Sequence, residues 1–246
     1  MVGPAIALLL CAPALAAPVV DASGSESAFL KGNYKDARTG FDGALKAFLA
    51  KAPRDGTQHK IYAEAEYLLD RLADCSFTQR DWDRLKHYED SEWRMVNQDI
   101  SVCREQLDGT VRSDGATRAV AQFVADRLDE SMRLRQIFQL KRSLALMLVD
   151  SGGQGGRAEK AIRLYQQLAL LMRKVISVED GAFRLDTGKL SDHIDEFESI
   201  NSELPETEMK PLWDKYKPAE EKSSSVKPPT KPAKPQAQPK TKSPAH

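Results

Sequence analysis

Apolar residues recur every three or four positions along most of this chain, a spacing typical of amphipathic helices. Residues 58–74 illustrate it, with apolar side chains at Ile61, Ala65, Leu68, Leu69 and Leu72. Runs of alternating apolar and polar residues bounded by turn residues, which predict strands, are nearly absent. The pattern therefore predicts an all-α fold.

Turn and capping residues divide this pattern into segments. We expect helices over residues 25–31, 33–52, 58–74, 116–150 and 157–178, and weaker ones over 188–203 and 206–216. Residues 79–107 keep the helical spacing, but the polar cluster Glu89–Glu92 interrupts it. The glycine-rich segment 151–156 is expected to be a hairpin loop. A phosphate-binding loop would follow a strand, whereas a predicted helix precedes this one.

The first 16 residues have the pattern of a cleavable signal peptide. Residues 5–16 are apolar and uncharged, and they end in the small-x-small motif Ala14-Leu15-Ala16. This run is shorter than the roughly 20 apolar residues that span a bilayer. We therefore expect cleavage near Ala16, a periplasmic or secreted protein, and no transmembrane span in the mature chain.

The composition changes after the predicted helical domain, which covers residues 25–216. Residues 217–246 are rich in Lys and Pro, and Val226 is their one large apolar residue. Such a segment buries too little surface to order itself, so we expect a disordered, extended tail. Beyond Glu221 its charges are all positive. Binding of anionic polymers or lipid head groups is one interpretation of the tail, and a disordered extension without a binding role is the other.

Two cysteines remain after the predicted cleavage, Cys75 and Cys103. An even pair in an oxidising compartment favours a disulfide, and two buried thiols are the alternative. If residues 79–107 formed one helix, Cys103 would lie about 36 Å along its axis from the turn beside Cys75. A disulfide needs Cα atoms within about 7 Å. We therefore predict the bridge together with a helix break near Asp90 and Ser91.

Two segments of the chain, residues 32–45 and 156–169, are alike. Each has a glycine, an alanine five residues on, an aromatic residue nine on, and a small or apolar residue twelve on. The shared positions are Gly32, Ala37, Phe41 and Ala44 in the first segment and Gly156, Ala161, Tyr165 and Leu168 in the second. This pattern resembles the second helix of a tetratricopeptide repeat. The resemblance implies a solenoid-like, irregular array of antiparallel helix hairpins that presents a groove to partner proteins.

No catalytic or cofactor-binding motif is evident in the sequence. The HExxH, GxSxG and CxxC patterns do not occur. Asp83, His87 and Asp90 share one helical face, and we interpret them as a solvated polar face rather than a metal site. We accordingly expect no catalytic residues, no cofactor and no metal.

The balance of positive and negative charges helps to decide which class of partner the protein binds. The chain has 36 basic and 36 acidic residues and a net charge of +0, which argues against nucleic acid as a partner. We predict an exported, non-enzymatic scaffold or adaptor of the bacterial envelope that binds another protein. An enzyme or small-ligand-binding domain with an unfamiliar helical site is one alternative. A structural accessory subunit that assembles through an exposed apolar patch is the other.

Overall fold

The computed structural model describes residues 22–51, 59–112, 118–179 and 182–217. Within these residues the fold is all-α apart from one two-stranded hairpin, which confirms the predicted class. The elements are α1 (Ser23–Leu30), α2 (Tyr34–Lys51), α3 (His59–Thr78), α4 (Trp82–Arg112), α5 (Arg118–Asp150), α6 (Gly155–Val175), β1 (Ile176–Glu179), β2 (Ala182–Leu185), α7 (Thr187–Asp192), α8 (Ile194–Ser202) and α9 (Glu206–Lys215). The predicted signal peptide and all of the predicted tail beyond Lys217 lie outside the described residues.

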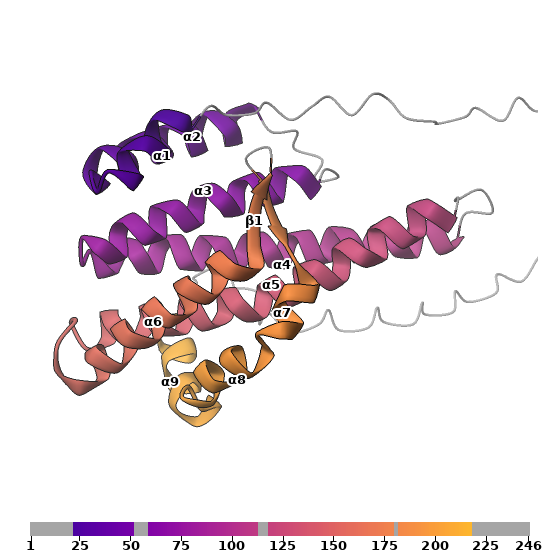
Figure 1. Ribbon diagram of the computed structural model, residues 1–246. Coiled ribbons are helices and arrows are strands. Elements are labelled where there is room, and N and C mark those ends of the chain that lie inside the picture. Colours follow the sequence, from indigo (N-terminus) through magenta and orange to yellow (C-terminus); the bar gives the residue numbers. More distant parts are fainter. Residues whose placement is uncertain (1–21, 52–58, 113–117, 180–181, 218–246) are drawn as a thin grey trace, which may run out of the picture.

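Consecutive helices pack against one another from α1 to α6 (Figure 1). Short turns at residues 31–33, 79–81 and 151–154 make the α1–α2, α3–α4 and α5–α6 pairs antiparallel. Helix α4 packs between α3 and α5, and α7–α9 pack against α5 and α6. This arrangement is an array of helix hairpins. Its relation to the tetratricopeptide family stays a prediction.

The core forms where the sequence places the apolar faces. Phe41, Leu72, Leu144 and Leu168, on four different helices, are fully buried in one hydrophobic cluster. Burying such a side chain contributes about 1.5–3 kcal/mol relative to leaving it exposed. The helical spacing of apolar residues within 58–74 therefore identified an inward face of α3, where Ala65, Leu68, Leu69 and Leu72 are buried.

The glycine-rich segment forms the turn between α5 and α6, as predicted. Gly152 and Gly153 have φ values of +60° and +70°, which favour glycine over other residues. Trp82 at the start of α4 covers the turn, and a Cβ atom at Gly153 would overlap its indole ring. Helix α6 begins at Gly155, slightly earlier than expected.

Helix α6 ends at Val175, before the predicted boundary near Val178, because the chain continues into a β-hairpin. Strands β1 and β2 pair antiparallel, with Ile176 opposite Leu185. The hairpin packs against α3, and the Leu185 N–H donates to Glu130 Oε1 on α5 at 3.0 Å. Tertiary contacts with α3 and α5 thus stabilise a hairpin that is too short to show a strand pattern in the sequence.

The predicted break near Asp90 is wrong, because α4 runs without interruption from Trp82 to Arg112. Ser91 donates its hydroxyl to the His87 carbonyl one turn earlier, as a serine inside a helix does. Cys103 therefore lies about 32 Å along α4 from Trp82, far from the turn beside Cys75. Among the described residues neither cysteine is in a disulfide, and both are buried. The predicted disulfide is wrong for the same reason as the predicted break.

We expect Cys75 and Cys103 to react fully with an alkylating reagent when the protein is unfolded without reductant. In the folded protein both should react slowly because they are buried, and burial also raises the pKa of Cys75 to about 12. Mass spectrometry of the peptides measures the extent of alkylation of each cysteine in the folded and the unfolded protein. A pair that becomes reactive only after reduction would contradict the unbroken α4.

Candidate functional site

A lysine lies buried among three carboxyl groups at the centre of the helix array. The Lys141 side chain on α5 is 2% exposed. Its Nζ atom lies 2.7 Å from Asp70 Oδ1 on α3, 3.0 Å from Glu92 Oε2 and 3.3 Å from Glu89 Oε1, both on α4. The Tyr165 hydroxyl on α6 donates to Glu89 Oε1 at 2.6 Å. These five residues, here called the Lys141 cluster, connect four helices.

The cluster holds more acids than cations. Burial alone lowers the pKa of Lys141, but Asp70, Glu89 and Glu92 raise it well above its usual value, so the ammonium stays charged. Burial raises the pKa of Glu89 and Glu92. The second oxygen of each glutamate is buried and has no hydrogen-bond partner within the described chain. Burial therefore disfavours the ionised form of both glutamates, whereas the charge of Lys141 favours it.

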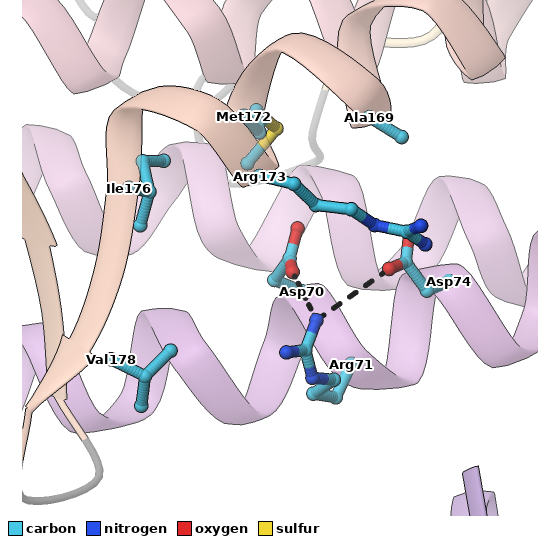
Figure 2. A pocket seen from close by; sticks show the side chains of 8 residues that line it. All are labelled: Asp70, Arg71, Asp74, Ala169, Met172, Arg173, Ile176 and Val178. Atoms are coloured by element: carbon cyan, nitrogen blue, oxygen red, sulfur yellow. Dashed lines mark hydrogen bonds and ion pairs between the residues drawn. The ribbon is translucent and has the colours of Figure 1, made fainter. Parts of the chain in front are cut away.

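Asp74 stands at the edge of this cluster, one helical turn beyond Asp70 on α3. Its side chain is 14% exposed. Burial, and then the charge of Asp70, raise the pKa of Asp74 to about 7. Asp70, Arg71 and Asp74 on α3 line a hollow of about 50 Å³ together with Arg173 on α6. Figure 2 shows Arg173 extending toward Asp74, and Arg71 paired with both aspartates. A carboxyl group that titrates near neutral pH is thus accessible from the surface.

A larger hollow of about 360 Å³ adjoins the first and shares Asp74, Ala169 and Arg173 with it. We call the two together the α3–α6 groove. Aromatic and apolar side chains make up most of its remaining wall. They are Phe29, Tyr34, Phe77, Tyr165 and Leu170. Leu170 is 55% exposed, so the groove offers an apolar side chain to a ligand beside a titratable acid.

Contacts between aromatic rings hold the wall of this groove in place. Phe77 stacks on Tyr165 with ring centroids 4.3 Å apart, and Phe29 meets Tyr34 edge to face at 5.5 Å. Because Tyr165 also donates to Glu89, the wall is tied to the Lys141 cluster. The groove is therefore largely formed before any ligand arrives.

Further buried ion pairs join α4 to α5. Asp90 Oδ1 lies 2.6 Å from Arg142 Nε, and Asp99 Oδ2 lies 2.8 Å from Arg127 Nη2. Ser131 Oγ donates to the same Asp99 oxygen at 2.7 Å. Asp99 follows Asp90 on α4, whereas its partner Arg127 precedes Arg142 on α5, as expected for antiparallel helices. These pairs set the register of the two longest helices.

The predicted polar face of Asp83, His87 and Asp90 is confirmed only in part. Asp83 and His87 are exposed, whereas Asp90 is buried against Arg142. Among the described residues, no group of three or more His, Cys, Asp or Glu side chains is arranged to hold a metal ion.

The two copies of the repeat-like motif differ at their glycine and agree at most of the later positions. Gly32 takes a φ of +77° in the α1–α2 turn, whereas Gly156 lies inside the first turn of α6. The later motif positions are buried, apart from the half-buried Ala44. The buried residues are Ala37, Phe41, Ala161, Tyr165 and Leu168. Only Tyr165 also belongs to the Lys141 cluster and the groove.

Sequence reasoning missed the Lys141 cluster, although the chain carries a signal for it. Lys141 and Arg142 are the charged residues of the largely apolar stretch 137–148, and Glu89–Glu92 interrupt the apolar spacing of α4. Opposite charges at two such interruptions, on neighbouring helices, indicate buried pairs.

Comparison of the chain with models of protein families, with curated proteins and with solved structures found no match. None of the described helices combines the length and the apolar character needed to cross a membrane. The geometry of the described residues therefore carries the functional argument.

Replacing Lys141 with Met should destabilise the protein by about 3–5 kcal/mol at pH 7, because buried carboxyl groups lose their cation. The loss should be smaller at pH 5, where the carboxyl groups are protonated more readily in both the folded and the unfolded chain. Urea unfolding at the two pH values measures the free energy of unfolding of the variant and of the unaltered protein. Lys174→Met, which removes an exposed ion pair with Glu196, is the control and should cost less than about 1 kcal/mol. Equal losses for the two variants would contradict the role of Lys141.

Proposed function

We propose that this chain is an exported, non-enzymatic scaffold whose α3–α6 groove binds a segment of another protein. The observation that carries the proposal is the position of Asp74, which lies where the two hollows of the groove meet, beside the exposed Leu170. Protein-binding sites commonly combine an apolar anchor with a few buried polar groups that fix its orientation. Aromatic side chains on α1 and α3 extend the apolar wall.

The charges around Asp74 favour a basic side chain on the partner. Asp70 and Glu89 raise the pKa of Asp74, whereas Lys141 and Arg71 lower it less than burial raises it. Arg71 already lies 3.8 Å from Asp74 Oδ2, and a Lys or Arg side chain placed on the groove side of Asp74 would add a second cation to this carboxyl group. The proposed partner segment therefore carries a basic residue close to an apolar one.

Replacing Leu170 with Glu should reduce the amount of partner protein recovered from envelope extracts by about tenfold or more, since central apolar contacts often contribute about 2 kcal/mol. The matched control is Leu49→Glu on α2, which changes a similarly exposed leucine away from the groove. Quantitative mass spectrometry of the proteins recovered with the full chain and each variant makes the comparison. Recovery of the same protein by all three would refute the groove, and recovery of none would favour the small-ligand alternative.

Affinity for that recovered protein should rise by about tenfold between pH 6 and pH 8, because Asp74 is mostly protonated below its pKa of about 7 and ionised above it. Asp74→Asn should bind more weakly at pH 8 and lose this dependence. Titration calorimetry at the two pH values measures both effects. An unchanged pH dependence in the variant would mean that another group carries it.

A further inference from the structure

A second groove lies between α5 and the helices α8 and α9, and it shares no lining residue with the α3–α6 groove. Its volume is about 700 Å³, within the range of ligand-binding clefts. Phe197 and Trp213 supply aromatic surface, and Gln136 and Gln139 on α5 supply amides. We call it the α5–α8 groove.

We propose that the Lys- and Pro-rich segment 222–242 of this same chain binds in the α5–α8 groove. This inference does not rest on the proposed function, because the site and the occupant are both different. This segment carries six lysines and follows α9 closely in the sequence.

Charge and composition match the segment to the groove. The charged residues that line the groove are Glu198 and Glu206, both acidic, whereas segment 222–242 carries lysines and no acidic residue. Its prolines favour the extended polyproline II conformation, which aromatic-lined grooves recognise at low entropic cost. Phe197 and Trp213 provide such a lining.

The length of the chain permits this binding within one molecule. Helix α9 spans Glu206–Lys215 and is about 15 Å long. Lys227 follows Lys217 by ten residues, which reach about 31 Å when extended. The segment therefore returns along α9 to Glu206 with chain to spare. A short tether also gives an effective concentration on the order of millimolar, so weak contacts are enough for occupancy.

Carbodiimide cross-linking of the full chain tests the contact directly, because it joins lysines to carboxylates that touch. We expect cross-links from Lys227, Lys231 and Lys234 to Glu198 and Glu206, and far fewer to Asp83 or Glu159, which are exposed on α4 and α6. Mixing isotope-labelled and unlabelled protein distinguishes links within one chain from links between chains. Links spread evenly over the surface, or links only between chains, would overturn the proposal.

A charge reversal gives an independent readout. Glu198→Lys with Glu206→Lys should free the segment and reduce its bound fraction by about tenfold, since two attractions become repulsions. The matched control, Asp83→Lys with Glu159→Lys, changes the net charge equally and should leave binding unchanged. Carbon-detected NMR relaxation of Ala233 and Ala237 in the full chain measures how far binding restricts the motion of the segment. Fast motion at these alanines in the unaltered protein at low salt would also overturn the proposal.

Discussion

The burial of opposite charges between α4 and α5 is the constraint on which the rest of the structure depends. Removing an ammonium or a carboxylate from water costs several kcal/mol, and only close partners offset that cost. Lys141 lies within 3.3 Å of three carboxyl oxygens, and Arg127 within 2.8 Å of Asp99. Sliding α5 along α4 would separate these partners at both ends of the contact. The ion pairs therefore fix the register in a way that apolar packing alone does not, because apolar contacts are non-directional.

This register also forms the candidate site. Lys141 holds Asp70 on α3 and Glu89 on α4, and Glu89 accepts from Tyr165 on α6. The same tyrosine stacks on Phe77 and lines the α3–α6 groove. Burial, and then the charge of Asp70 in the cluster, raise the pKa of Asp74 to about 7 where it lines the groove. A network that stabilises the core thus sets the charge of the surface next to it.

Much of the fold could be predicted from the sequence, and little of the site. The apolar spacing located an inward face of α3, and the glycines located the α5–α6 turn. The prediction failed at Glu89–Glu92, where consecutive polar residues were interpreted as a break in α4. Three of these four residues are buried, because their partners, Lys141 and Arg142, lie about fifty positions later on α5. Nothing within the local pattern distinguishes a buried acid from an exposed one.

The sequence by itself determined the helical class, the turns and most of the apolar faces, since each depends on residues within a few positions of one another. The tertiary structure decided the continuity of α4, the separation of Cys75 from Cys103, and the short β-hairpin after α6. It also brought Asp74 and Leu170 to one groove from helices far apart in the chain. These features depend on desolvation and on pairing between distant residues. Desolvation and long-range pairing contribute to stability only when the helices have packed.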